Sequence, residues 1–147
     1  MRKLKIACVL DDFTMKCYEG IAELIQIKSD NWYEKMNENR PDILFVESIW
    51  KGEDDSWKDI VLSNETHKYM ILRDIINWCN KKNIPTVFWN KEDPINYKFF
   101  IKLARLFDYV FTTDEDSINR YKQDLNHDRI FTLLFAANPK IHNPIKY

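Results

Sequence analysis

Short apolar runs alternate along the chain with longer segments in which apolar residues recur at helical spacing. The short runs are rich in Ile, Val, Leu and aromatic residues, a pattern typical of strands buried on both faces of a parallel sheet. The predicted strands are Lys5 to Leu10, Glu23 to Ile27, Asp42 to Val46, Ile84 to Trp89, Tyr109 to Thr112 and Arg129 to Phe135.

The segments between these runs predict amphipathic helices. The longest covers Asn64 to Lys82, and Asn83 is suited to the left-handed position that ends it. Ser29 and Asp30 are predicted to cap a helix that ends before Pro41. The other predicted helices are a short one around Met15 to Tyr18, one from Tyr97 to Ala104 and one from Ile118 to Leu125.

Strands that alternate with helices in this way predict an α/β fold. We expect a Rossmann-like or flavodoxin-like open sheet, mostly parallel, of about six strands with helices on both faces. Asn138-Pro139 and Asn143-Pro144 break regular structure near the end of the sequence. We therefore predict a domain over residues 1–137 and a linker or tail over residues 138–147.

Composition narrows the class of protein. The chain has 147 residues and a net charge of −1, so it has no basic footprint for nucleic acid. No apolar run approaches the roughly 20 residues that span a bilayer. Cys8, Cys17 and Cys79 form no CxxC pair, which favours reduced, buried thiols in a cytoplasmic protein.

Polar residues follow the predicted strands. The carboxyl ends of parallel strands meet at one edge of a sheet, where open α/β sheets bind their ligands. We therefore expect these residues to gather at that edge: Asp11 and Asp12; Glu47, Ser48 and Trp50; Asn90, Lys91, Glu92 and Asp93; Thr113 and Asp114; Ala136, Ala137 and Asn138.

The turns after the predicted strands lack the residues that two kinds of phosphate site and a phospho-receiver site require. Gly20 and Gly52 are the only glycines, and neither follows a strand directly, so a dinucleotide-binding turn or a P-loop is not present. Asp11-Asp12 suits a phospho-receiver domain. However, Glu47-Ser48 and Thr113-Asp114 occupy the positions where a receiver places its Asp and its Lys.

Two further features have competing interpretations. Asp114-Glu115-Asp116 has the DxD spacing of a cation site, but Thr113 with Asp116 fits a capping box, which we favour. No metal site is predicted, and the histidines have no ligand spacing. Trp50 and Trp57 flank a polar loop, where each either stacks on a sugar or another domain or has a structural role.

Four motifs in order along the chain carry a resemblance: FVESIW, FWNKEDP, FDYVFTTDED and FAANPKIHNP. Together they resemble the N-terminal domain of the CgeB/YkvP-like bacterial glycosyltransferases, which act in spore-coat, teichoic-acid or other cell-wall glycan assembly. The resemblance implies a GT-B arrangement of two Rossmann-like domains. The N-terminal domain contacts the acceptor, and the C-terminal domain holds the nucleotide-sugar donor.

The resemblance implies that Glu47, Ser48, Trp50, Asn90 to Asp93, Thr113 and Asp114 line the acceptor side of the cleft. It implies no cofactor, a glycan or polyol-phosphate acceptor, and a nucleotide-sugar donor that binds only with a C-terminal domain. Glu47 and Asp93, then Glu92, are the predicted bases that take the acceptor's proton, and Lys91 either pairs with Asp93 or meets an anionic acceptor. The alternative is a non-catalytic binding or regulatory module.

Overall fold

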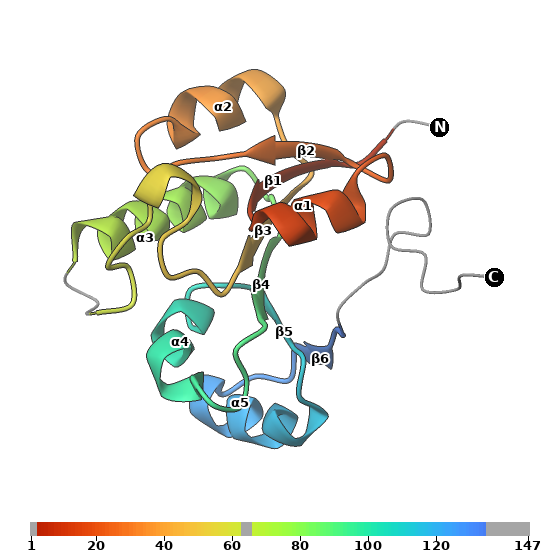
Figure 1. The fold of residues 1–147 in the computed structure, drawn as a ribbon, viewed down its shortest axis with the longest axis vertical. Helices are drawn as coiled ribbons and strands as arrows, with labels where there is room; N and C mark the ends of the chain where they lie inside the picture. Colours follow the sequence, from red (N-terminus) through yellow and green to blue (C-terminus); the bar gives the residue numbers. More distant parts are fainter. Residues whose placement is uncertain (1–2, 63–65, 135–147) are drawn as a thin grey trace.

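The computed structural model describes residues 3–62 and 66–134, and six strands in these ranges form one parallel sheet. The strand order is β2-β1-β3-β4-β5-β6, so the predicted open α/β sheet is confirmed (Figure 1). The strands are β1 (Lys5–Val9), β2 (Glu23–Gln26), β3 (Ile43–Glu47), β4 (Thr86–Asn90), β5 (Tyr109–Thr112) and β6 (Ile130–Thr132).

A helix follows each of the first five strands, as parallel pairing requires. The helices are α1 (Asp12–Tyr18), α2 (Trp32–Asn39), α3 (His67–Lys81), α4 (Tyr97–Ala104) and α5 (Ile118–Leu125). Short 3₁₀ turns, η1 (Glu53–Asp55) and η2 (Glu115–Ser117), lie after β3 and before α5.

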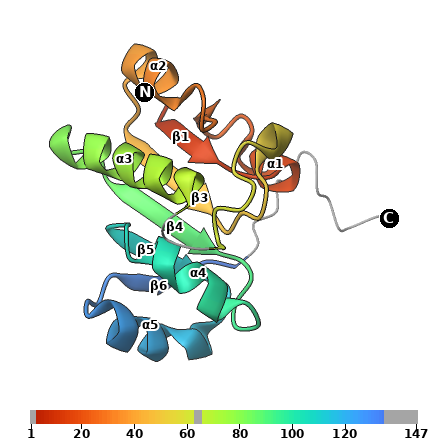
Figure 2. The ribbon, with the colours of Figure 1, turned by 90° about the vertical axis from the view of Figure 1, so that its left-hand side faces the viewer.

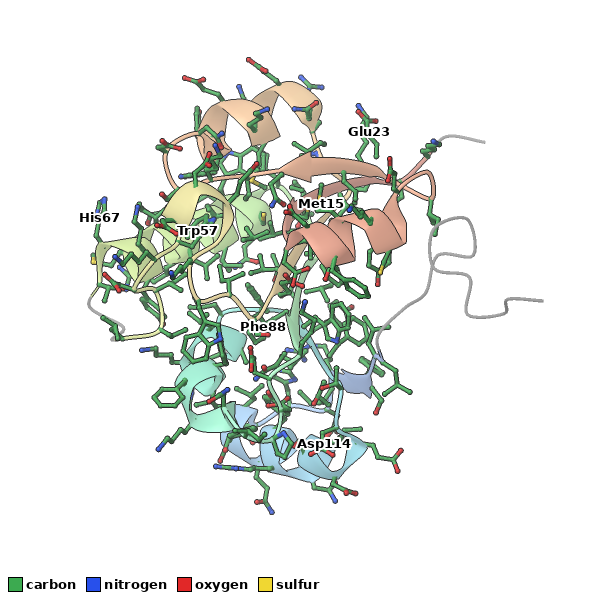
Figure 3. The ribbon with its side chains drawn as sticks, in the orientation of Figure 1. Met15, Glu23, Trp57, His67, Phe88 and Asp114 are labelled. Carbon is green, nitrogen blue, oxygen red and sulfur yellow. The ribbon has the colours of Figure 1, made fainter. Side chains whose placement is uncertain are left out.

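Helices cover both faces of the sheet, because successive residues of β4 contact different helices. Phe88 packs against Phe100 of α4, with ring centroids 6.4 Å apart. Trp89 packs on Phe45, which contacts Tyr18 of α1. Neighbouring strand residues point to opposite faces, so α1 and α4 lie on opposite sides of the sheet. Figure 2 shows α3, α4 and α5 together on one face, and Figure 3 places Phe88 at the centre of the molecule.

The longest helix, α3, has the cap, the buried face and the end that its local sequence favours. Thr66 caps α3 by accepting a hydrogen bond from the backbone N–H of Tyr69 at 3.2 Å. Leu72, Ile75 and Cys79 are buried on its inner face. Asn83 follows in the left-handed region with φ 57°, as predicted.

Other predicted boundaries were wrong by a few residues. Asn31, and not Ser29 or Asp30, is at the N-cap of α2, and its side chain accepts from the N–H of Lys28. The last strand is shorter than predicted, since β6 ends at Thr132. The start of the predicted α3 segment at Asn64, the predicted domain boundary after residue 137, the tail over residues 138–147, His142, and Ala136, Ala137 and Asn138 lie outside the described residues.

Candidate functional site

A cavity of about 610 Å³ opens beyond the carboxyl ends of β1 and β3, where the strand order reverses. Crevices at this position are the usual ligand sites of open α/β sheets, and the volume is in the range of small-molecule sites. We call this space the cavity. Its lining residues are Leu10, Asp11, Asp12, Gln26, Glu47, Ser48, Ile49, Trp50, Gly52, Glu53, Asp54, Lys91 and Glu92.

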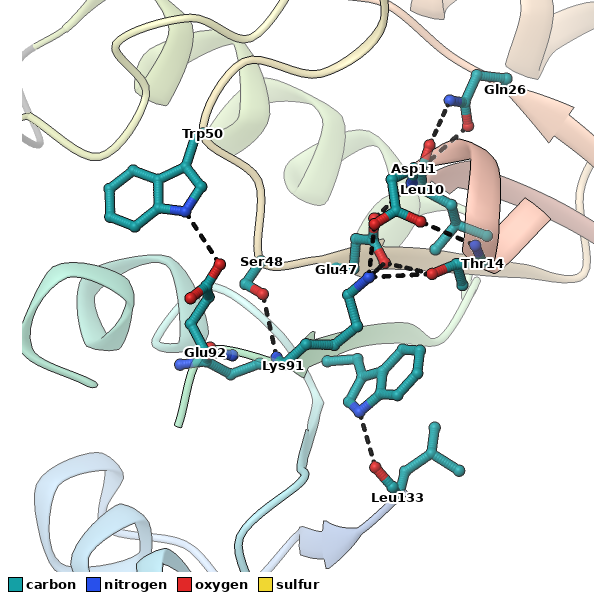
Figure 4. Close-up of polar contacts among 12 residues, drawn as sticks. Leu10, Asp11, Thr14, Gln26, Glu47, Ser48, Trp50, Lys91, Glu92 and Leu133 are labelled. Carbon is teal, nitrogen blue, oxygen red and sulfur yellow. Dashed lines mark hydrogen bonds and ion pairs between the residues drawn. The ribbon is translucent and has the colours of Figure 1, made fainter. Parts of the chain in front are cut away.

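The sheet register brings three charged residues of the cavity together. Glu47 is the last residue of β3 and pairs in register with Trp89 of β4, two residues before Lys91. Asp11 follows β1 and caps α1 by accepting from the N–H of Thr14 at 2.8 Å. Figure 4 shows the Lys91 side chain reaching across the edge of the sheet to Asp11 and Glu47.

Glu47 and Lys91 form a buried ion pair inside this group. The Lys91 Nζ lies 2.6 Å from Glu47 Oε2 and 2.8 Å from Asp11 Oδ2, and the Glu47 side chain is only 1% exposed. Thr14 donates its hydroxyl to Glu47 at 2.9 Å, and the Asp11 N–H donates to the other Glu47 oxygen. Of the two interpretations left open for Lys91, the pair with Asp93 was wrong, because Lys91 extends toward β1 and pairs with Asp11 and Glu47.

Burial and charge act against each other at these groups. Burial raises the pKa of Glu47 above its ordinary value, and the Lys91 ammonium only partly offsets this. Burial also acts to raise the pKa of Asp11, but bonds from Lys91 and Thr14 outweigh it, so that pKa is lowered. Burial acts to lower the pKa of Lys91, but its bonds to Asp11 and Glu47 outweigh burial and raise it.

Trp50 and Glu92 form a second wall of the cavity. The Trp50 indole N–H donates to Glu92 Oε1 at 3.1 Å, and the ring packs edge-on against Phe100 at 4.9 Å. The other Glu92 oxygen accepts from the Asn96 amide at 3.0 Å. Trp50 remains 41% exposed, so an aromatic surface is held in place beside carboxylates and open to solvent.

The loop after Trp50 is fixed by Trp57, which is 1% exposed and belongs to the core. Its indole N–H donates to the Ile27 carbonyl oxygen. Gly52 crosses over it with φ 72°, and a Cβ there would lie 2.5 Å from the Trp57 ring. The sequence left open whether Trp57 stacks on a sugar or another domain or has a structural role, and the structural role is confirmed.

A different group of polar residues forms beside the cavity, and we call it the Asp93 cluster: Asn90, Asp93, Thr112 and Tyr121. Asp93 Oδ2 accepts from Thr112 Oγ1 at 2.6 Å and from the Tyr121 hydroxyl at 2.7 Å. Its Oδ1 accepts from the Asn90 amide at 2.9 Å. Asn90, Thr112 and Tyr121 are fully buried. Asp93 does not line the cavity.

Burial raises the pKa of Asp93, although the bonds from Thr112 and Tyr121 act to lower it. Tyr121 belongs to α5, so the cluster joins β4, β5 and α5. All its donors are uncharged side chains, and they surround the carboxylate from within the fold. The cluster therefore orders the turn after β4 and fastens α5 to the sheet.

Asp114 lies on the α5 side (Figure 3), and neither Thr113 nor Asp114 lines the cavity. Asp114, and not Thr113, is at the N-cap position of η2, and it accepts from the Ser117 hydroxyl at 2.7 Å. The predicted capping box of Thr113 with Asp116 was therefore wrong, because Asp114 takes the N-cap position and makes no side-chain bond to a backbone N–H of that turn. Among the described residues, no group of three or more His, Cys, Asp or Glu side chains could hold a metal ion.

Sequence reasoning missed several residues that shape the cavity. Gln26 binds both the N–H and the carbonyl oxygen of Leu10 through its side-chain amide, and thereby fixes the end of β1 against β2. Thr14 lies three residues after Asp11, a spacing that could have indicated a shared helix start. Glu53 and Asp54 come from a loop whose path depends on buried Trp57, and no local signal predicts that.

No family model matches the chain, and no curated protein matches its sequence. Within residues 3–62 and 66–134, no helix is long and apolar enough to cross a membrane. The cysteines predicted to be reduced and buried are indeed free and buried.

Proposed function

We propose that this chain is the acceptor-binding domain of a glycosyltransferase, and that the cavity at the ends of β1, β3 and β4 holds the sugar that receives the transferred unit. The observation that carries the proposal is the exposed Trp50 ring fixed beside carboxylates at the mouth of a cavity of about 610 Å³. Aromatic rings stack on the apolar faces of sugars, and carboxylates accept hydrogen bonds from their hydroxyls.

Glu47 is the favoured base in this proposal. It lines the cavity, and burial raises its pKa, which makes the carboxylate a stronger proton acceptor. Glu92 lines the cavity too, and its two oxygens accept from Trp50 and Asn96 as those of Glu47 accept from Asp11, Thr14 and Lys91. Hydrogen bonding therefore does not separate the two carboxylates, and the burial of Glu47 is what favours it. Asp93 is enclosed by its three donors outside the cavity, which favours a structural role for it.

The backbone at this edge supports placing the nucleotide-sugar donor on another domain. A diphosphate needs free backbone N–H groups that point toward it. Here the N–H groups of Leu10, Asp11 and Lys91 donate to the side chains of Gln26, Glu47 and Ser48, respectively. The N–H of Ser48 donates to the Trp89 carbonyl oxygen.

Calorimetry on the full chain tests the proposal. A methyl glycoside such as methyl β-glucoside should bind in the millimolar range or tighter, and Trp50→Ala should abolish that binding. UDP-glucose should show no more affinity than the glycoside alone. Tight binding of UDP-glucose to this chain would contradict the proposal. So would a glycoside affinity that Trp50→Ala leaves unchanged.

Turnover tests the role of Glu47 in a polypeptide that joins this domain to a donor-binding domain. Glu47→Gln should lower kcat by about 100-fold, because the acceptor hydroxyl loses its base. Asp93→Asn is the matched control and should leave kcat within about 3-fold, since Asp93 lies outside the cavity. Equal effects of the two changes on kcat would contradict the assignment of Glu47 as the base and of Asp93 as a structural residue.

One observation favours the second candidate, a binding module without catalysis. Among the described residues, every buried side-chain nitrogen and oxygen has a hydrogen-bond partner, so Glu47 rests in a satisfied network. A binding module predicts glycoside affinity that depends on Trp50 together with a kcat that Glu47→Gln does not change. The turnover experiment therefore separates the two candidates.

A further inference from the structure

We infer that the ligand of the cavity is rich in hydrogen-bond donors and carries no phosphate, and that a sugar with a free amine binds more tightly than its hydroxyl counterpart. This inference rests on the proposed function, because it takes the cavity to be the acceptor site. It selects between the glycan and polyol-phosphate acceptors that the sequence left open. The argument comes from which polar groups of the cavity are already engaged.

The lining of the cavity offers mainly acceptors. Among the described residues that line it, Lys91 is the one basic residue, set against six acidic ones: Asp11, Asp12, Glu47, Glu53, Asp54 and Glu92. An ionised carboxylate accepts hydrogen bonds and donates none. A ligand that satisfies this surface must therefore supply the hydrogens.

Lys91 has no proton left for an anion. An ammonium has three N–H donors. In Lys91 they meet Asp11 Oδ2 at 2.8 Å, Glu47 Oε2 at 2.6 Å and Thr14 Oγ1 at 3.0 Å. A phosphate that drew the Lys91 ammonium toward itself would leave the buried Glu47 carboxylate without part of its compensation, which is costly at 1% exposure.

Few other side chains of the wall can donate. The Trp50 indole N–H is bound to Glu92, and one N–H of the Gln26 amide is bound to the Leu10 carbonyl oxygen. The Ser48 hydroxyl accepts from the Lys91 N–H and keeps its own hydrogen to donate. A phosphate would thus meet several carboxylates and find few donors to offset their repulsion.

An amine meets the opposite situation. The Asp11 side chain is 55% exposed, and Asp12 and Glu53 are exposed on the lining. Lys28 already pairs with Asp54 at 2.5 Å, so Asp54 has less charge to offer a ligand than Asp12 and Glu53. An ammonium on a sugar bound against Trp50 would form charge-assisted hydrogen bonds with these carboxylates.

The test uses four probes on the full chain: methyl glucoside, its 2-amino analogue, the N-acetylated analogue and glucose 6-phosphate. The Trp50 indole signal in a proton–nitrogen NMR spectrum, assigned with Trp50→Phe, reports binding. The amino sugar should bind about 3- to 10-fold more tightly than the neutral glycosides, and glucose 6-phosphate about 10-fold more weakly or not at all. The preference for the amine should shrink as salt rises.

A matched pair of variants tests the source of the preference. Glu53→Gln removes a lining charge, and Glu38→Gln removes an exposed charge on α2 that does not line the cavity. Only Glu53→Gln should lower the preference for the amine, by about 2- to 3-fold. Equal effects of the two variants would mean that the preference is a property of overall charge, which contradicts the inference.

The remaining outcomes separate the inference from the proposed function. If glucose 6-phosphate binds at the Trp50 signal as tightly as the glycosides or more tightly, the inference is wrong while the acceptor site stands. If the amino sugar shows no advantage over methyl glucoside, the claim for the amine is wrong. If none of the four probes shifts the Trp50 signal, the proposed function itself fails and the inference fails with it.

Discussion

Two carboxylates lie at the ends of adjacent strands, Glu47 buried and Asp93 partly buried, and they are held in different ways. Glu47 ends β3, lines the cavity, and is compensated by a full positive charge on Lys91 at 2.6 Å. Asp93 follows β4, lies outside the cavity, and is held by the neutral donors of Asn90, Thr112 and Tyr121. Burial raises the pKa of both groups.

The difference teaches that a raised pKa alone does not mark a reactive group. The Asp93 cluster is closed, because each of its donors comes from the sheet or α5 and none faces the cavity. The Glu47 group borders open space, and its cation comes from a side chain that crosses the edge of the sheet (Figure 4). Position relative to the cavity therefore decides which carboxylate is proposed to meet a ligand.

The largest expected effect comes from breaking the charged pair. Lys91→Met leaves Glu47 buried without its cation and should lower the free energy of unfolding at pH 7 by about 3–5 kcal/mol. Urea denaturation measures this loss. The double variant Lys91→Met with Glu47→Gln should recover part of it, because the uncompensated charge is gone.

The same variant carries a pH signature. Without Lys91, the pKa of Glu47 in the folded state lies still further above its unfolded value of 4.5. Glu47 therefore takes up a proton at a higher pH in the folded variant than in the unfolded chain. The deficit of Lys91→Met should therefore shrink as the pH falls from 7 toward 5. A deficit that stays constant across this range would mean that lost packing, and not charge, explains the destabilisation.

Breaking the Asp93 cluster should cost less. Asp93→Ala leaves the donors of Asn90, Thr112 and Tyr121 without their acceptor, and it should lower the free energy of unfolding by about 2–4 kcal/mol. Asp93→Asn retains an accepting oxygen and should cost about half as much. Glycoside binding should be unchanged in Asp93→Asn. A loss of binding would mean that the Asp93 cluster takes part in ligand binding together with the cavity.

A smaller effect follows from the raised pKa of Asp93. Its folded value lies above the unfolded 3.8, so the folded state holds the proton to higher pH than the unfolded state does. Stability contributed by this group is thus present at low pH and is lost as the pH rises through the folded value. The stability gap between the native chain and Asp93→Asn should therefore be wider at pH 4 than at pH 7 in urea titrations.

Trp50 should give the smallest change in stability and the largest in binding. It is 41% exposed and packs mainly on Phe100, so Trp50→Ala should cost about 1 kcal/mol or less. The same change should abolish glycoside binding, whereas Trp50→Phe should retain part of it. A loss of stability much larger than this would indicate that Trp50 has a structural role like that of Trp57.

The fold could be predicted because the signals for it are local. The apolar runs that form β1, β3 and β4 are short and nearly free of polar residues, and helical spacing marked α3. These patterns predict parallel strands with helices between them. The ends of elements were predicted less well, since the N-cap of α2 is decided by the contact of Ser29 with Ser56, 27 residues away.

The candidate site could be predicted only in part. Strand ends correctly located Asp11, Glu47, Ser48, Trp50, Lys91 and Glu92 on one cavity. Strand ends do not tell to which side a turn residue points. Asn90, Asp93, Thr113 and Asp114 were expected at the same place, but none of them lines the cavity, and Asn90 and Asp93 bond to Tyr121 of α5 instead. The sequence also could not predict that Lys91 pairs with Asp11, because the two residues are 80 positions apart in the chain.

The central claim is that one of the two polar regions binds a sugar and the other does not. Backbone amide shifts of the full chain titrated with methyl 2-amino-2-deoxyglucoside test it most directly. The account predicts changes at Asp11, Ser48 and Lys91 and at the Trp50 indole, with Tyr121 and Asp114 unmoved. Changes centred on Asp93, Asp114 and Tyr121, with the Trp50 indole unmoved, would contradict it.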